Sequence, residues 1–179
     1  GAHVRPGVGM SRLTNSSARR MWMDFLMSRW GPGHQETEMP PVPEAWAFGY
    51  GAELETELAE LVVVGTKRAT ASCLEGILVD GEPMPFVGAY SVILDGAATA
   101  RCIIRTTRVH VAPLNSVSEE FAWREGEGDR SRAYWLEAHR SFFRREQEEA
   151  GRRFFDELPV VFEEFTVVWP REICDTEAS

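Results

Sequence analysis

The segment GTKRATAS brings a lysine, an arginine and three hydroxyl groups together between the apolar run LAELVVV and a stretch of alternating apolar residues. Lys67 and Thr70 are three positions apart, and Ser72 follows Thr70 at the two-residue spacing of one strand face. An amine and a hydroxyl at this spacing suit proton transfer and nucleophilic chemistry. The same residues also suit a plain helix end, where a lysine offsets the last carbonyl groups.

A second polar group, WREGEGDRS, carries three carboxylates beside two glycines. Taken alone, Glu125, Glu127 and Asp129 describe an acidic turn that leads into the next helix. If Lys67 and one of these carboxylates share a partly enclosed site, each shifts the pKa of the other, and such pairs are candidates for acid and base catalysis. The spacing alone leaves open whether the two segments meet.

Other catalytic classes find little support in the sequence. There is no G-x-S-x-G, no Walker loop and no G-x-G-x-x-G after a strand. The four histidines have no neighbouring serine, cysteine or metal pattern, and His139, four residues after Trp135, is interpreted as a packed residue on a helix face. The three cysteines form no C-x-x-C pair, which predicts reduced and mostly buried thiols.

The composition is typical of one compact domain, since 44% of the 179 residues are hydrophobic and 26% are charged. No window reaches the run of about eighteen apolar residues that a membrane helix needs, so we expect a cytoplasmic protein with no membrane partner. The net charge of −9 argues against a broad basic surface for long nucleic acid, and nothing points to DNA. The oligomeric state is left open.

The periodicity predicts a leader over residues 1–15, disordered or left from cloning, then a helix from Ser16 or Ser17 and a proline-rich connection up to residue 47. In the run MPPVPEAWAFGYG, which begins in that connection and continues past it, Trp46, Phe48 and Tyr50 alternate, so they either wall a pocket or hold the loop onto the barrel. A helix then ends at Gly65, and alternating strands follow, with Asp80-Gly81 and Asp95-Gly96 as turn or hairpin signals.

The second half begins with a capping-box match, Ser116-Val117-Ser118-Glu119, which opens a helix that the EGEGD glycines end. A longer helix over about 131–150 and a final strand, VVFEEFTVVW, complete the pattern. These elements predict an α+β fold in which a small, partly closed, mixed or antiparallel β-barrel is surrounded by three or four helices.

The run from AFGYGAELETELAELVVVGTKRATAS to EGEGDRSRAYWLEAHRSFF resembles the ASCH family, whose domains are PUA-like β-barrels. The resemblance implies an ASCH domain over 48–170, with a C-terminal tail over 171–179, and it implies RNA or a modified nucleoside as the partner. Small members hydrolyse the amide of N4-acetylcytidine with a Lys, a Thr three positions later and a Glu, which match Lys67, Thr70 and Glu125. That reaction needs no cofactor.

Around these catalytic candidates, the residues expected to bind substrate are Ser72, Arg68, Trp46, Tyr50 and Trp135. Two departures bear on the substrate: Ser72 stands where the small enzymes have an arginine, and Gly88-Ala89 stands where Gly-Asp is common. The alternative function is a ribonuclease acting on single-stranded RNA, in which Glu127 and Asp129, with Glu125, would hold Mg²⁺ or Mn²⁺. A binding module without catalysis is the third possibility.

Overall fold

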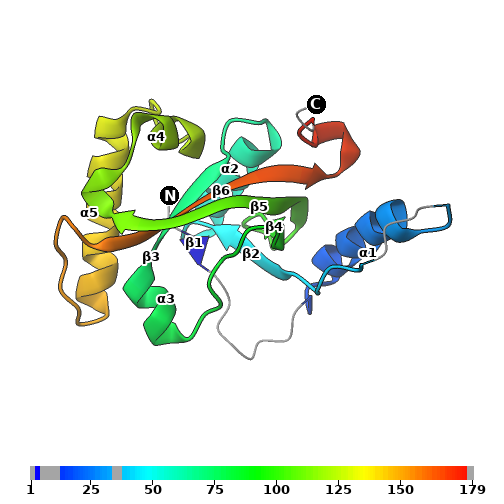
Figure 1. Cartoon of the computed structure of the whole chain (residues 1–179), viewed down its shortest axis with the longest axis horizontal. Coiled ribbons are helices and arrows are strands. Elements are labelled where there is room, and N and C mark those ends of the chain that lie inside the picture. The colour runs from blue at the N-terminus through cyan, green and yellow to red at the C-terminus, as the bar shows by residue number, and fades with distance from the viewer. Residues whose placement is uncertain (1–2, 5–12, 34–37, 177–179) are drawn as a thin grey trace.

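One curled sheet organises the protein, and helices cover both of its faces (Figure 1). The structure is a computed structural model that describes residues 3–4, 13–33 and 38–176. Ten of the fifteen positions assigned to a leader, residues 1–2 and 5–12, therefore lie outside the described residues, as do 34–37 and 177–179.

The sheet has the strand order β1-β2-β4-β5-β6-β3. Its strands are β1 (His3–Val4), β2 (Glu44–Phe48), β3 (Ala69–Cys73), β4 (Tyr90–Leu94), β5 (Ala100–Pro113) and β6 (Pro159–Trp169). All neighbours are antiparallel except β2 and β4. The backbone of β1 lies beside β2 at one edge and also contacts β3 at the other edge, so the sheet curls toward a barrel.

Five α-helices pack around this sheet, one or two more than expected. They are α1 (Ser16–Trp30), α2 (Ala52–Val63), α3 (Leu74–Asp80), α4 (Glu119–Glu125) and α5 (Arg132–Glu149), and two short 3-10 turns lie at Leu114–Ser116 and Arg171–Ile173. The α+β class and the partly closed, mostly antiparallel barrel are confirmed. Among the described residues no helix is both long enough and apolar enough to cross a membrane.

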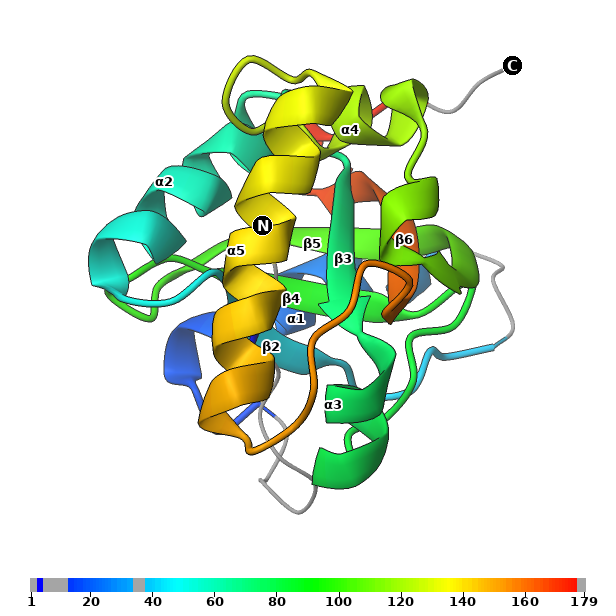
Figure 2. The same cartoon turned by 90° about the vertical axis from the view of Figure 1, so that its left-hand side faces the viewer.

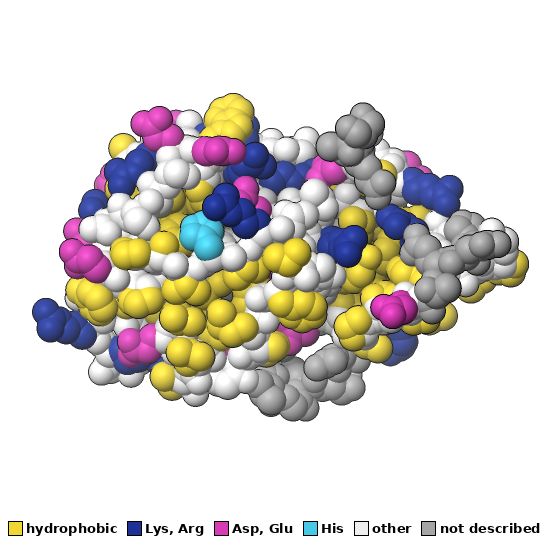
Figure 3. Space-filling model, viewed as in Figure 1, with side chains coloured by type: hydrophobic (Ala, Val, Ile, Leu, Met, Phe, Trp, Pro, Cys, Tyr) yellow, Lys and Arg dark blue, Asp and Glu magenta, His cyan; other side chains and the backbone are white. Residues whose placement is uncertain are grey.

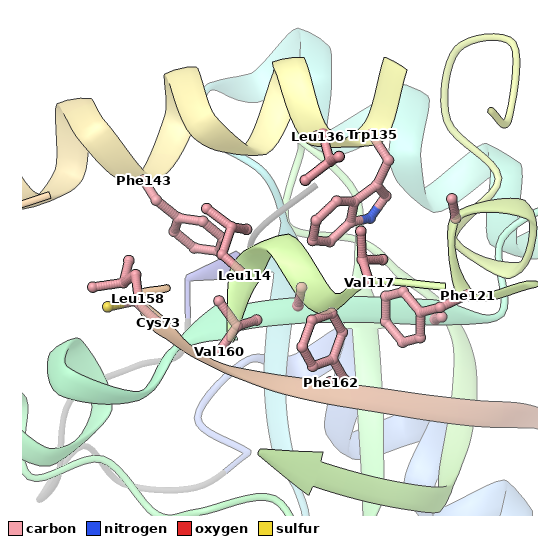
Figure 4. Close-up of a cluster of buried hydrophobic side chains, with 13 residues drawn as sticks. Cys73, Leu114, Val117, Phe121, Trp135, Leu136, Phe143, Leu158, Val160 and Phe162 are labelled. Carbon is pink, nitrogen blue, oxygen red and sulfur yellow. The ribbon is translucent and has the colours of Figure 1, made fainter. Parts of the chain in front are cut away.

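Three hydrophobic clusters join the helices to the sheet. The first lies between α5 and strands β3 and β6 (Figure 2), and Figure 4 shows Trp135 and Phe143 of α5 facing Phe162 and Val160 of β6. The second cluster, around Phe48 and Phe165, lies under α2. The third joins α1 to β4 and β5. On the face drawn in Figure 3, hydrophobic side chains form a broad band and charges of both signs are scattered around it.

Several local predictions differ from the structure. Asp80-Gly81 is the end of α3, where Gly81 takes the left-handed conformation, because this conformation suits a helix stop as well as a hairpin. Within the proline-rich connection, residues 44–48 form strand β2, because its prolines precede the paired residues. The first turn of α1 is capped by Asn15, and Ser118 caps α4 without a capping box at Ser116.

The cysteine prediction is confirmed in part. Cys73, Cys102 and Cys174 are all free thiols, and the first two are buried while Cys174 is exposed. Burial raises the pKa of the Cys102 thiol to about 12, so this group stays protonated and behaves as a small apolar side chain.

Candidate functional site

The two polar segments of the sequence meet as adjacent turns, one between α2 and β3 and the other after α4. The amide of Arg68 donates to the carbonyl of Arg124 across a distance of 2.6 Å. Gly126 ends α4 with a φ of +78°, and a Cβ on this residue would lie 2.4 Å from the carbonyl oxygen of Thr66. Only glycine therefore lets the backbones approach this closely.

Arg130 holds the same two turns together from the outside. Its guanidinium lies 3.4 Å from the ring centroid of Trp123 and donates to the carbonyl groups of Trp123 and Thr66, at 2.9 and 3.2 Å. Arg130 also has a positive φ of 65°, which is uncommon outside glycine. Arg130 could not be singled out from the sequence, because its hydrogen-bond acceptors are backbone carbonyl groups, which no residue type reveals.

Lys67 is the one lysine of the chain, and it is completely buried. Its Nζ donates to the carbonyl oxygens of Ala69 at 2.9 Å and Glu125 at 3.4 Å. The same atom lies 3.3 Å from Oε2 of Glu127 and 4.0 Å from Oε1 of Glu125, and it faces the ring of Phe48 at 5.1 Å. A buried ammonium with this many acceptors is held in one position.

Burial moves the pKa values of Lys67 and Glu127 toward each other. It lowers the pKa of Lys67 from 10.5 to about 7 and raises the pKa of Glu127 from 4.5 to about 7. Their mutual attraction at 3.3 Å opposes both shifts, because it favours the charged form of each partner. The pair can therefore exchange a proton near neutral pH. Glu127 keeps 19% of its side-chain surface exposed, whereas Lys67 and Glu125 keep none.

Glu125 is enclosed by α5. Its Oε2 accepts from the indole Nε1 of Trp135 at 2.5 Å, and its Oε1 lies 2.8 Å from Nε2 of His139. The imidazole stacks on the indole with 3.8 Å between ring centroids, and burial lowers the pKa of His139 well below its ordinary value. His139 is thus a packed helix residue, as expected, but it also reaches the proposed site. This contact could not be predicted from the sequence, because Glu125 belongs to another helix than His139.

Thr70 and Ser72 lie on the face of β3 opposite the α5 cluster. Thr70 is completely buried and pairs in register with Glu163 of β6, whose carboxylate accepts from Thr106 at 2.8 Å. Ser72 lines a hollow of 310 Å³ between β3, α3 and α5, which Tyr50 also lines. The other walls of this hollow are mainly acidic: Asp80, Glu82, Glu146 and Glu149, with Arg152 as the one basic residue.

The remaining substrate-binding candidates are engaged elsewhere. Arg68 makes a two-pronged ion pair with Asp175, with both distances at 2.9 Å. Trp46 is buried against Phe48 in the second cluster. Tyr50 is 53% exposed, stacks on Phe142, and donates to Glu146 at 3.4 Å. Of the two interpretations of the alternating aromatics, Trp46 and Phe48 fit packing and Tyr50 fits a pocket wall.

Glu125, Glu127 and His139 are the group of described residues whose donor atoms lie close enough for a metal ion, all within 4.8 Å. Asp129 is not among them, because it is exposed and accepts from the Ser131 amide at the start of α5.

The ammonium of Lys67 already lies against both carboxylates and would repel a divalent ion. The residues present therefore do not fit a resident metal in this arrangement.

Comparisons with known proteins agree on one family. The sequence matches the family model of the ASCH domain over residues 44–169. A solved ASCH domain from Lactobacillus crispatus JV V101 is 33% identical with a TM-score of 0.76, covering 89% of this chain and 96% of that one. A protein from Enterococcus faecalis V583 is 36% identical with a TM-score of 0.74, covering 86% and 88%. No curated protein matches the chain.

Proposed function

The chain belongs to the ASCH domain family, and on this basis we propose that it hydrolyses the amide bond of a small N4-acylated cytidine. The observation that carries the proposal is the buried pair of Lys67 and Glu127. Lys67 lies three residues before Thr70 on one continuous turn and strand. Amide hydrolysis needs a base for the attacking oxygen and an acid for the leaving nitrogen, and a pair that holds one proton can supply both.

In the proposed reaction the neutral amine of Lys67 takes a proton from the attacking oxygen, which Thr70 either supplies or positions. The new C–O bond forms at the acyl carbon, and the C–N bond then breaks as Glu127 gives its proton to the departing N4. If Thr70 supplied the oxygen, a water molecule next attacks the acyl-threonine ester, the ester C–O bond breaks, and a proton from that water passes to the Thr70 oxygen, which restores the hydroxyl. On either route the oxygen of one water ends in the carboxylic acid, and the released nucleoside carries the amine. The Lys67 ammonium returns a proton to Glu127, which restores the starting state.

Glu127 takes the acid role here in place of Glu125, for two structural reasons. Glu127 is the partly exposed member of the two and lies nearer to the amine of Lys67. Both oxygens of Glu125 already face groups of α5, the indole of Trp135 and the imidazole of His139. We therefore assign Glu125 to the wall of the site.

The charge near Ser72 supports a nucleoside more than an RNA chain. Four carboxylates line the hollow that Tyr50 and Ser72 share, and a phosphodiester backbone would be repelled there. An uncharged nucleoside has no such cost, and Tyr50 offers an aromatic face for stacking on a base.

Purified protein incubated with N4-acetylcytidine should release acetate and cytidine. Lys67→Met and Glu127→Gln should each lower kcat/KM by about a hundredfold or more, the scale of lost acid–base catalysis. The matched control is Glu137→Gln, an exposed glutamate of α5, which should keep wild-type turnover. Full turnover by Lys67→Met would remove the proposal.

Two further assays on the same purified protein distinguish the two alternative functions. Cleavage of labelled single-stranded RNA that stops with a chelator, without acetate release, would establish the metal-dependent ribonuclease instead. Salt-dependent RNA binding with no product in either assay would establish a binding module.

A further inference from the structure

A layer of polar side chains crosses the inside of the barrel beside the second hydrophobic cluster. Neighbouring strands each contribute one buried or partly buried residue: Glu44 of β2, Ser91 of β4, Thr106 of β5, Glu163 of β6 and Thr70 of β3. Two positions further along, the same strand faces carry apolar residues of that cluster, such as Trp46, Ile93 and Phe165. The polar layer therefore interrupts an apolar interior, where polar groups need hydrogen-bond partners.

A hollow of 240 Å³ opens onto this layer. Its floor includes Ser91, Thr106 and Glu163, and its walls come from two proline-containing segments, residues 41–44 and 83–86. The hollow is smaller than the roughly 300–1,000 Å³ of sites for drug-sized ligands, so it suits a compound of about one ring.

Thr106 fixes the floor of the hollow. Its amide donates to the carbonyl of Ala89 at 2.9 Å, and its carbonyl accepts from the amide of Gly88 at 2.8 Å. Its hydroxyl donates to Oε1 of Glu163 at 2.8 Å. Glu163 also makes contacts within the protein beyond Thr106. A carboxyl group has about four acceptor sites, so a ligand N–H can join these contacts.

Ser91 is the member of the layer that points most directly to a ligand. It is only 7% exposed, and within the described part of the chain its hydroxyl makes no hydrogen bond. Its backbone is fixed between β2 and β5, in register with Glu44 and Ile104, so the residue stays at the floor of the hollow. A buried hydroxyl without a partner is costly. A molecule bound in the hollow would supply the missing partner.

We propose that this hollow binds a small cyclic amide, whose carbonyl oxygen accepts from the Ser91 hydroxyl and whose N–H donates to Glu163. An amide edge carries an acceptor and a donor side by side, which matches a hydroxyl near a carboxyl group. An ammonium group only donates, so it would leave the Ser91 hydrogen without an acceptor. An anion would lie beside the carboxyl groups of Glu44 and Glu163, which disfavours it.

The rim of the hollow fits the apolar part of such a ring. Val42, Met84 and Phe86 line it and are exposed large apolar side chains. A ring that covers them removes apolar surface from water, which favours binding. The inference does not rest on the proposed hydrolysis, because none of the described residues that line the hollow belongs to the proposed catalytic group.

δ-Valerolactam is the probe for this site, because its six-membered ring carries one amide edge and is otherwise apolar. N-methyl-δ-valerolactam is the matched control, since it keeps the ring and the carbonyl group and lacks the N–H donor. In ¹H–¹⁵N NMR titrations of the full chain, δ-valerolactam should bind with a Kd of about 1 mM or lower. It should shift the amide signals of Ser91 and Thr106. The N-methyl compound should bind about fivefold more weakly or less, the scale of one lost hydrogen bond.

Ser91→Ala tests the hydroxyl. It should weaken δ-valerolactam binding about fivefold or more, while the unfolding midpoint of the free protein stays the same or rises, because the hydroxyl removed had no hydrogen bond. Phe86→Ala should weaken both lactams alike, since it removes an apolar contact that they share. Ser141→Ala, at an exposed serine of α5, is the control and should bind δ-valerolactam as the wild type does.

Three results would overturn the proposal: no binding of δ-valerolactam to the folded wild type at about 10 mM, equal binding of the two lactams, or wild-type binding by folded Ser91→Ala. Tighter binding of piperidine, a ring of the same size with an ammonium group, would show that the hollow takes an organic cation instead. None of these measurements follows hydrolysis, so a missing hydrolase activity and a hollow that binds no lactam give separate results.

Discussion

Replacing Lys67 by methionine tests the physical basis of the site without a substrate. Methionine has nearly the same length and is apolar, so the variant removes the amine and keeps the volume. Lys67 is fully buried, and its pKa is lowered to about 7 from the ordinary 10.5. Between these two values the unfolded chain binds a proton that the folded chain does not hold. Wild-type stability therefore rises with pH across this window.

The magnitude follows from that difference. At pH 7 the burial of Lys67 costs about 4 kcal/mol of folding free energy, and at about pH 9.5 the cost is near 1 kcal/mol. The variant lacks this cost at every pH, and it also lacks the hydrogen bonds from Nζ to the carbonyl oxygens of Ala69 and Glu125. The loss of those contacts lowers its stability by about 1 to 3 kcal/mol. We therefore expect Lys67→Met to be more stable than wild type near pH 7 and to lose this advantage by pH 9.5.

The assay is urea unfolding of both proteins at several pH values. The difference in unfolding free energy should fall by about 3 kcal/mol from pH 7 to 9.5. Tyrosines and cysteines titrate equally in both proteins and cancel in the difference, and no other lysine contributes. A difference that stays constant across this window would refute the reasoning, because it would show that Glu127 keeps Lys67 charged despite its burial.

Four further substitutions, one of them a control, test how the site and the first helix are supported. Gly126→Ala should cost about 3 kcal/mol or more in urea unfolding, because its Cβ would overlap a backbone oxygen. Gly151→Ala, also at a positive φ but with open space around it, should cost only about 1 kcal/mol; equal losses would contradict the close approach. Asp175→Ala should cost about 1 to 2 kcal/mol, because it removes both bonds to the partly buried Arg68; an unchanged midpoint would show that the ion pair is not stabilising. Asn15→Ala should lower thermal stability through loss of the α1 cap by about 1 kcal/mol, and differential scanning calorimetry measures this change.

The sequence predicted most of the sheet because its strands alternate clearly. The runs ARCIIRTTRVHV and VVFEEFTVVW became β5 and β6, since β-branched and aromatic residues fit a pleated surface. The helix α3 was missed because Asp80-Gly81 has the same local chemistry at a helix end as in a hairpin. That ambiguity is settled only by tertiary packing.

The two polar segments of the site could be predicted from the sequence, but the contact between them could not. Lys67 and the EGEGD glycines are visible in the sequence, but the fit of Gly126 against Thr66 depends on a backbone approach that no residue type announces. His139 is the clearest omission. The residues four positions before and after it on the helix are aromatic, while its partner Glu125 lies fourteen positions earlier on a separate helix.

The ion pair between Arg68 and Asp175 links the turn that carries Lys67 to residues 107 positions later in the chain. During synthesis from the N-terminus, this turn and strand β3 emerge long before Asp175, which later forms the ion pair with Arg68. β3 also lacks its pairing partner until β6 is made, and β6 is among the last elements of the chain. The amine of the lysine is therefore still hydrated when the turn first emerges, because Glu125 and Glu127, which face it in the folded protein, are made 58 and 60 residues later. The site acquires its unusual acidity only when these later residues have folded over the lysine.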